Sequence, residues 1–186
     1  MGKLPWRNQV TKSTDATIQN LSVAVLTVSD TRTDENDTSG QYLALALEEA
    51  GHKLAEKQIV QDNIYQIRAI ISSWIAADEV QAILVTGGTG FSSRDSTPEA
   101  LNPLFDKAIE GYGELFRYLS YEEIGTSTIQ SRAVGGLANN TVIFCIPGST
   151  GACRTAWRGI IRDQLDSTHR PCNFVGVLNV RSSEKA

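Results

Sequence analysis

The sequence predicts an α/β fold of three layers, in which a mostly parallel sheet lies between helices on both faces and a small antiparallel hairpin is added. Three observations predict it. Short apolar runs recur along the chain, segments with apolar residues at helical spacing follow them, and the two kinds alternate. Alternation favours parallel strands, because a crossover helix must carry the chain back to the start of the next strand.

Most elements can be assigned from this pattern, because buried parallel strands appear as short, nearly continuous apolar runs. The expected elements are a strand over Leu21–Val28, a helix from Thr38 or Ser39 through Glu49, a strand over Lys53–Val60, a helix over Ile64–Ala77, a strand over Val80–Val85 and a helix that starts in "STPEA". In that last helix, Pro98 takes an early position and Ser96 precedes Glu99 by three residues, as in a capping box.

The second half of the chain is less regular. Glycines interrupt the helical patches of Glu110–Ser131. "AVGGLANNTVIFCI" predicts two short strands about an Asn139-Asn140 turn, and a final helix is expected over roughly Thr150–Leu165. The domain is expected to span residues 21–174, between a flexible N-terminal arm (1–20) and a C-terminal tail (175–186).

Composition excludes several classes of function. A net charge of −4 and a pI near 5.2 argue against a broad nucleic-acid or anionic-membrane footprint. The three cysteines show no C-x-x-C spacing and the two histidines lie far apart, so a metal would depend on oxygen ligands. Since the chain has neither a secretory leader nor an apolar run of about 18 residues, we expect a cytoplasmic protein.

Three loops are expected at the carboxyl edge of the sheet, where open α/β sheets bind ligands. They are "SDTRTD", "GGTGFSSRDSTP" and "PGSTGACR". Gly87, Gly88 and Gly90 permit positive φ and close approach of backbone N–H groups to an anion such as phosphate. A tight turn without a ligand explains these glycines equally well, and ordinary helix capping explains the third loop. The dinucleotide and Walker glycine patterns are absent, which argues against a dehydrogenase.

Asp95 suggests a metal. A carboxylate inside an anion cradle repels phosphate unless a cation lies between them, and Mg²⁺ prefers carboxylate, phosphate and water oxygens. Asp62, after the neighbouring strand, can supply a second carboxylate. Each aspartate can instead be a solvated loop acid or an N-cap, and Arg94 can either clamp phosphate or face water.

These motifs resemble the MoaB/Mog family of molybdenum cofactor biosynthesis. The resemblance covers roughly Leu21–Phe174, and its most specific pieces are "TVSD", "DTSG", "TGGTGFSSRDSTPEAL" and "IPGS". "EEIGTSTIQSRAVGGLAN", "GSTGACRTAW" and "RPCNF" resemble the MoaB branch.

The resemblance implies a molybdopterin-binding fold and a nucleotidyltransferase that adenylylates molybdopterin with ATP and Mg²⁺ and releases pyrophosphate. Asp62 and Asp95 match the family's catalytic and metal-binding acids. The implied substrate- and nucleotide-binding residues are Ser29, Asp30, Gly87, Gly88, Thr89, Gly90, Thr97, Ser120, Ser131, Pro147, Gly148 and Ser149. It also implies a homotrimer or a dimer of trimers, and a molybdate-inserting enzyme as a partner.

The chain departs from the Mog branch at two places. Ser149 and Thr150 follow the Pro-Gly where that branch usually has Asn or Gln and then Pro, and one extra residue separates Ser120 from Ser131. A non-catalytic molybdopterin carrier is therefore an alternative. A nucleotide pyrophosphatase like the related domain of the CinA family is another, although that family normally carries a further domain, for which the chain has no room.

Overall fold

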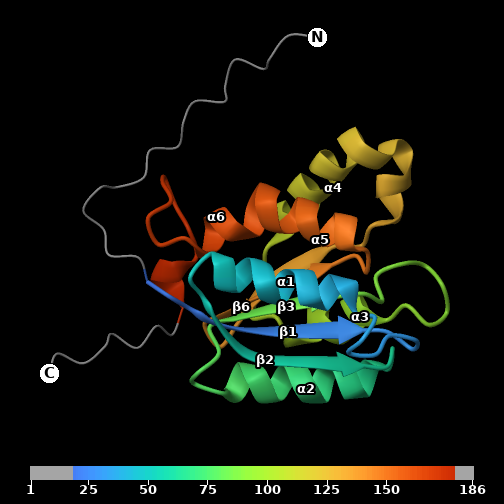
Figure 1. Cartoon of the computed structure of the whole chain (residues 1–186), viewed down its shortest axis with the longest axis horizontal. Coiled ribbons are helices and arrows are strands. Elements are labelled where there is room, and N and C mark those ends of the chain that lie inside the picture. Colours follow the sequence, from blue (N-terminus) through green and yellow to red (C-terminus); the bar gives the residue numbers. More distant parts are fainter. Residues whose placement is uncertain (1–18, 179–186) are drawn as a thin grey trace, which may run out of the picture.

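A six-stranded sheet forms the centre of the protein, in the order β2-β1-β3-β6-β5-β4 (Figure 1). The structure, a computed structural model, describes residues 19–178. The strands are β1 (Ser22–Val28), β2 (Lys53–Val60), β3 (Ala82–Thr86), β4 (Lys107–Ala108), β5 (Val134–Ala138) and β6 (Thr141–Ile146). Strands β2, β1, β3 and β6 are parallel, β5 is antiparallel to β6, and β4 is antiparallel to β5.

Helices cover both faces of the sheet, so the predicted α/β architecture is confirmed (Figure 1). They are α1 (Thr38–Glu49), α2 (Ile64–Ala76), α3 (Thr97–Leu101), α4 (Glu110–Ile124), α5 (Thr150–Ala156) and α6 (Arg162–Leu165). The short 3-10 segments are η1 (Asn102–Leu104), η2 (Gly125–Gln130) and η4 (Val175–Val177), and η3 (Trp157–Ile161) is a π-helical turn. None of the helices in the described part of the chain is long and apolar enough to cross a membrane.

Two hydrophobic cores lie on opposite faces of the sheet, because successive side chains of a strand point in opposite directions. In β1, Val23 and Val25 pack into the core beneath α1, α4 and α5. Ala24 and Leu26 pack into the core beneath α2 and α3. All four are fully buried, which explains why this strand is apolar at nearly every position.

Several expected boundaries are corrected. The third strand begins at Ala82 rather than Val80, because Val80 N instead donates to Ala77 O in a turn and the pairing with β1 starts at Ala82. Asp37, and not Thr38 or Ser39, caps α1 by accepting a hydrogen bond from Gly40 N. The final helix contains the π-helical turn η3 and is not one regular α-helix.

The irregular second half contains α4, which Gly125 ends with a φ of 58°. The Asn139-Asn140 turn forms as predicted: φ is 46° and 59° at the two residues, and a two-residue hairpin of this type needs positive φ at both. Strand β4 was not anticipated. It has only two residues, both exposed, so it leaves no apolar pattern.

Candidate active site

A cleft lies at the carboxyl edge of the parallel strands, where the three predicted loops meet. We call it the edge cleft; its volume is about 270 Å³. Seven of the predicted site residues line it: Ser29, Asp30, Asp62, Gly87, Gly88, Asp95 and Gly148. The other lining residues are Thr27, Val28, Arg32, Asp37, Ser39, Thr86 and Arg94. Parallel topology thus brings together residues that lie far apart in the sequence.

The turn after β3 depends on two of its glycines. Gly87 and Gly88 have φ of 105° and 61°, which L side chains rarely adopt. A Cβ on Gly87 would collide with the backbone of Val28, and one on Gly88 would collide with the side chains of Asp62 and Thr97. Gly90 differs from the prediction, because its φ is not positive. A Cβ there would lie 2.8 Å from Asp95 Oδ2.

Asp62 follows β2 and is only 9% exposed. Its Oδ1 accepts hydrogen bonds from Ser96 N at 3.1 Å and from Ser96 Oγ at 2.6 Å. Its Oδ2 faces the Cα of Gly88. The prediction of a capping box at the start of α3 is therefore wrong, because the Ser96 hydroxyl donates to Asp62 and makes no side-chain cap.

Asp95 lies at the other end of the glycine loop, where its Oδ2 accepts a hydrogen bond from Ser92 N at 2.8 Å. The pKa of Asp95 is lowered, chiefly by hydrogen bonding to Ser92, although partial burial opposes this shift. The nearby positive charge of Arg132 lowers it further. Asp95 is therefore an anion at neutral pH.

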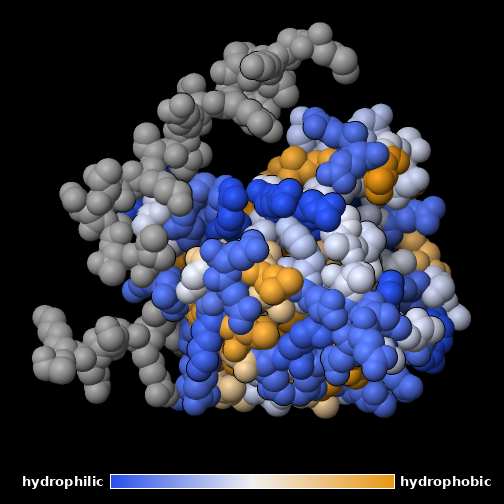
Figure 2. All heavy atoms as spheres, in the orientation of Figure 1, coloured by the Kyte–Doolittle hydropathy of each residue, from blue (hydrophilic) through white to orange (hydrophobic). Residues whose placement is uncertain are grey.

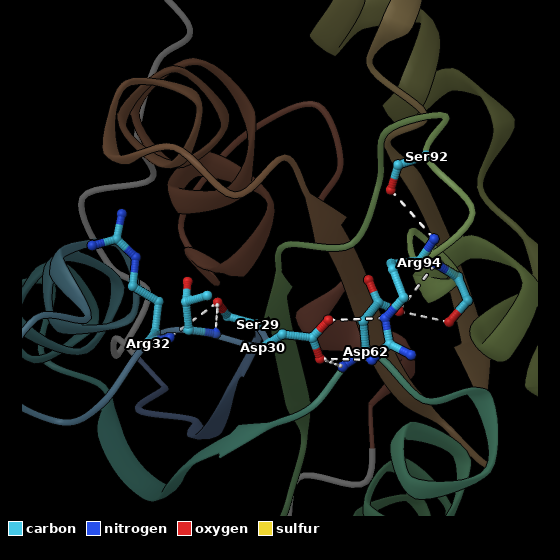
Figure 3. Close-up of polar contacts among 8 residues, drawn as sticks. Ser29, Asp30, Arg32, Asp62, Ser92 and Arg94 are labelled. Atoms are coloured by element: carbon cyan, nitrogen blue, oxygen red, sulfur yellow. Dashed lines mark hydrogen bonds and ion pairs between the residues drawn. The ribbon is translucent and has the colours of Figure 1, made fainter.

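Arg94 pairs with Asp30 across the mouth of the edge cleft (Figure 3). Its Nε donates to Asp30 Oδ2 at 2.9 Å and its Nη2 to Asp30 Oδ1 at 2.8 Å. Asp30 Oδ1 also accepts a hydrogen bond from Asp62 N at 3.1 Å. The pKa of Asp30 is lowered, first by its hydrogen bond to Arg94 and then by that backbone contact.

Arg132 holds the glycine loop from its other side. Its Nε donates to Thr89 O and its Nη2 to Asp95 O, both at 3.1 Å. Its Nη1 pairs with Glu99, and the guanidinium carbon lies 5.1 Å from the centre of the Phe91 ring. One side chain thus fixes both ends of the segment between the cleft glycines and Asp95.

Asp37 forms a buried part of the cleft floor and was missed by sequence reasoning as a site residue. Asp37 is 1% exposed. Its Oδ2 accepts a hydrogen bond from Thr27 Oγ1 and forms an ion pair with Lys57 Nζ, each at 2.9 Å. Ser39 Oγ donates to Gly148 O at 3.1 Å and so joins the first turn of α1 to the loop after β6. The only signal in the sequence was that Asp37 begins "DTSG".

Four more of the predicted residues, Thr89, Thr97, Pro147 and Ser149, belong to the loops and helix starts next to the cleft but do not line it. Thr89 and Thr97 are buried, and within residues 19–178 the Thr97 hydroxyl has no hydrogen-bond partner. Pro147 O accepts a hydrogen bond from Thr86 Oγ1, and Ser149 Oγ caps α5 by accepting one from Ala152 N.

A second cavity of about 470 Å³ is lined by Ser131, Arg117 and Arg132 among others. The structure thus separates the two serines: Ser120 is buried in α4 and lines neither cavity. Arg132 contacts both the second cavity and the loop that forms one wall of the edge cleft.

Comparison with known proteins identifies the family. A model of the family described as "Probable molybdopterin binding domain" matches residues 24–167. The chain belongs to this family. It is 61% identical over 152 residues to Molybdenum cofactor biosynthesis protein B of Escherichia coli strain K12, covering 82% of this chain and 89% of that protein.

Solved structures agree with the molybdopterin-binding fold. A crystal structure of a Molybdenum cofactor biosynthesis protein B is 43% identical, with a TM-score of 0.78, and the match covers 81% of this chain and 94% of that one. The tungsten cofactor synthesizing protein MoaB from Pyrococcus furiosus is 33% identical, with a TM-score of 0.70, over 76% and 91% of the two chains.

In this molybdopterin-binding domain, the side-chain groups beside the glycine turn that could bind a metal are the carboxylate oxygens of Asp62 and Asp95. Within residues 19–178, no three Asp, Glu, His or Cys side chains cluster closely enough to hold a metal by themselves. Asp62 and Asp95 approach the turn beside Gly88 and Gly90, respectively. Two carboxylates completed by phosphate and water oxygens suit Mg²⁺, so the residues present fit this ion.

Proposed function

We propose that the chain is a molybdopterin adenylyltransferase that uses ATP and Mg²⁺. The observation that carries this proposal is that Asp62 and Asp95 line one cleft at the carboxyl edge of the sheet, Asp62 beside the positive-φ Gly88 and Asp95 beside Gly90. An acidic pair at an anion-binding turn has a clear use when the ligand is a metal-bound polyphosphate.

In the proposed reaction, the terminal phosphate of molybdopterin attacks the α-phosphorus of ATP. A bond forms between a phosphate oxygen and that phosphorus, the bond to the bridging α–β oxygen breaks, and pyrophosphate leaves with its charge. No general base is needed, because the attacking phosphate is already an anion. The chain must therefore position two anionic groups and offset their charge.

Each part of the site has a proposed task. Backbone N–H groups that follow Gly87 in the turn, those of Gly88 and Thr89, would bind phosphate oxygens, because Gly87 N already donates to Ile146 O. Asp62 and Asp95 would hold Mg²⁺, which neutralises triphosphate charge when bound. Ser96 orients Asp62, and Arg132 orients the segment that ends at Asp95.

The second cavity is proposed to hold the pterin. Its volume of about 470 Å³ is within the range of small-molecule sites, and Ser131 with Arg117 supplies polar contacts. Arg132 lies between this cavity and the edge cleft, which supports the idea that the two serve one reaction.

The test is to incubate the purified protein with molybdopterin, ATP and MgCl₂ and to detect adenylylated molybdopterin and pyrophosphate. Asp95→Asn should abolish the product, whereas Asp163→Asn, on α6 and outside both cavities, should not. Product formation that persists in both Asp62→Asn and Asp95→Asn would contradict the metal assignment.

A carrier that binds molybdopterin without modifying it is the second candidate. One observation favours it: Ser149 caps α5, and Thr150 Oγ1 donates to Thr38 Oγ1 at 2.9 Å, so both hydroxyls that follow Pro147-Gly148 are used within the protein. Bound but unmodified molybdopterin in the same assay would support this reading. AMP release from ADP-ribose with added metal would instead support a pyrophosphatase.

We also propose that the protein works in the cytoplasm and that a molybdate-inserting enzyme consumes its product there.

The proposed assembly is a homotrimer or a dimer of trimers. Apolar side chains gather over α4 and η2, at the top of the view in Figure 2, which supports an interface there. Leu115, Ile124 and Ile129 are exposed in the single chain. Light scattering after size-exclusion chromatography would give the assembly mass, and a monomer would contradict this proposal.

A further inference from the structure

The Asp30–Arg94 ion pair joins two loops that bound the edge cleft. Arg94 comes from the loop after β3, and Asp30 comes from the loop after β1. Both hydrogen bonds of the guanidinium go to one carboxylate, in the fork geometry that arginine forms with carboxylates and with phosphates. The side chains are 62% and 36% exposed, so an entering ligand can reach them.

Arg94 also offsets part of the negative charge on the acidic side of the cleft. Asp30 Oδ1 contacts Asp62 N, so the carboxylate bound by Arg94 lies directly beside a proposed metal ligand. The charge of Asp62 adds to the shift that Asp30 causes when it raises the pKa of Arg94. The guanidinium thus pairs directly with Asp30 and attracts Asp62 only through its longer-range charge.

We propose that Arg94 is an exchangeable counterion: its guanidinium pairs with Asp30, next to Asp62, in the free protein and transfers to phosphate oxygens when a metal-bound polyphosphate enters. The incoming cation then balances the carboxylates. This inference rests on the proposed function, since it takes a nucleoside triphosphate or its pyrophosphate end as the ligand.

The exchange is physically reasonable for three reasons. A guanidinium binds phosphate in the same two-pronged manner as carboxylate. An exposed ion pair contributes little net stability, so its loss is easily offset. Arg94 is also attached near the ligand turn, because its backbone N donates to Ser92 Oγ at 3.3 Å and Ser92 N binds Asp95.

The competing interpretation is that the pair only ties the two loops together. The two interpretations predict opposite changes in cation affinity when Arg94 is lost. A simple tether predicts that loss of Arg94 loosens the cleft and weakens the binding of every ligand. A counterion predicts that loss of Arg94 strengthens the binding of a cation alone and weakens the binding of phosphate.

The experiment measures both ligands separately in Arg94→Gln. Free Mn²⁺, followed by its electron paramagnetic resonance signal, should bind about fivefold more tightly than to wild type, because a nearby positive charge is removed. Pyrophosphate with EDTA, followed by calorimetry, should bind about tenfold more weakly, because charge-assisted hydrogen bonds are lost. Asp30→Asn should bind metal-free pyrophosphate more tightly, because Arg94 is released.

Arg32→Gln is the matched control. Arg32 also lines the edge cleft, but its Nη1 donates to Asn36 O and its side chain points away from the ion pair (Figure 3). The same loss of charge there should change Mn²⁺ affinity by less than twofold. A Mn²⁺ gain as large as that in Arg94→Gln would mean that overall charge causes the effect, which overturns the proposal.

The outcomes distinguish failure of the counterion role of Arg94 from failure of the proposed function. If wild type binds Mn²⁺ and Mg²⁺-pyrophosphate but Arg94→Gln weakens both, the counterion role is overturned and the proposed function stands. If folded wild type binds neither ligand, both are overturned. Thermal unfolding of each variant verifies that it folds, and Arg94→Lys, which keeps the charge, should retain Mn²⁺ affinity near that of wild type.

Discussion

The Ser96 hydroxyl donates a hydrogen bond of 2.6 Å to Asp62 Oδ1 and so joins the first residue before α3 to the end of β2. The backbone N of Ser96 binds the same oxygen at 3.1 Å. Two donors from one residue fix the orientation of the carboxylate, which leaves Oδ2 directed at the glycine turn. The serine thus positions Asp62 instead of capping its helix.

Ser96→Ala tests this role. The variant keeps the backbone donor but loses the hydroxyl, so Asp62 should turn more freely. We expect roughly tenfold weaker Mn²⁺ binding and a loss of about 1 kcal/mol in the free energy of unfolding. Ser73→Ala is a suitable control, because Ser73 lies near the C-terminal end of α2, lines neither cavity, and its hydroxyl contacts only Ile70 O among the hydrogen bonds of the described chain. Unchanged Mn²⁺ affinity in Ser96→Ala would argue against a positioning role.

Gly88→Ala should damage the site more than the fold. At a φ of 61° an added Cβ is strained, and it would also displace Asp62 and Thr97. We expect a loss of about 1–3 kcal/mol in stability and complete loss of pyrophosphate binding. Denaturant unfolding and calorimetry would measure the two effects.

Gly111→Ala is the control for that substitution. No heavy atom lies within 4 Å of a Cβ at Gly111, which is the second residue of α4. Alanine also favours a helix, so this variant should be neutral or slightly more stable. Pyrophosphate binding by Gly88→Ala at the wild-type affinity would show that the turn tolerates a side chain, and the phosphate cradle would then need revision.

His52 should make stability depend on pH. It is buried, and its Nδ1 accepts a hydrogen bond from Leu21 N at 3.2 Å, which requires a neutral ring. Burial lowers the pKa of His52, although Asp166 acts in the opposite direction. Since the folded pKa lies below the unfolded value of about 6.5, the unfolded chain binds more protons between these two values.

The direction of the pH dependence follows from this difference between the folded and unfolded pKa of His52. The stabilisation is complete above about pH 6.5 and is lost as the pH falls through the folded pKa. Urea unfolding of wild type from pH 7.5 to 5.5 should therefore show falling stability, and His52→Gln, which keeps an acceptor without titrating in this range, should show a shallower slope. Equal slopes in the two proteins would exclude His52 as the cause.

The sequence was sufficient for the elements whose pattern is local. Lys53–Val60 was predicted with its observed bounds, and the Asn139-Asn140 hairpin was predicted from its turn residues. The cap of α1 was not, because Asp37, Thr38 and Ser39 all have capping side chains. Contacts from Lys57 and Thr27, remote in sequence, select Asp37.

In the candidate site, too, some features could be predicted from the sequence and others could not. Strand order brings the three loops to one edge, so the residues of the edge cleft follow from topology once the strands are assigned. Side-chain partners do not follow. Asp30 and Arg94 are 64 positions apart, and no local pattern marks them as a pair. Arg132 likewise carries no local signal, because its contacts to the glycine loop join residues 43 and 37 positions apart.

Arg132 should affect both the rate and its pH dependence. Arg132→Lys keeps the charge but lacks the planar fork that reaches Thr89 O, Asp95 O and Glu99 together. For the proposed adenylylation we therefore expect about a tenfold lower kcat, with the acid limb of the pH–rate profile unchanged. Arg132→Gln also removes a positive charge that lowers the pKa of Asp95. Its acid limb should move to higher pH, because Asp95 then protonates more readily.

Arg68→Gln is the control that separates positioning from simple packing. Arg68 also binds main-chain carbonyls of α3, with Nε on Ala100 O at 3.2 Å and Nη2 on Glu99 O at 2.9 Å, but it lies outside both cavities. Its loss should lower the unfolding temperature and leave the pH profile unchanged. If Arg132→Gln gives the same result as Arg68→Gln, then Arg132 only stabilises the loop. A shifted acid limb in Arg132→Gln alone would connect its charge to the ionisation of Asp95.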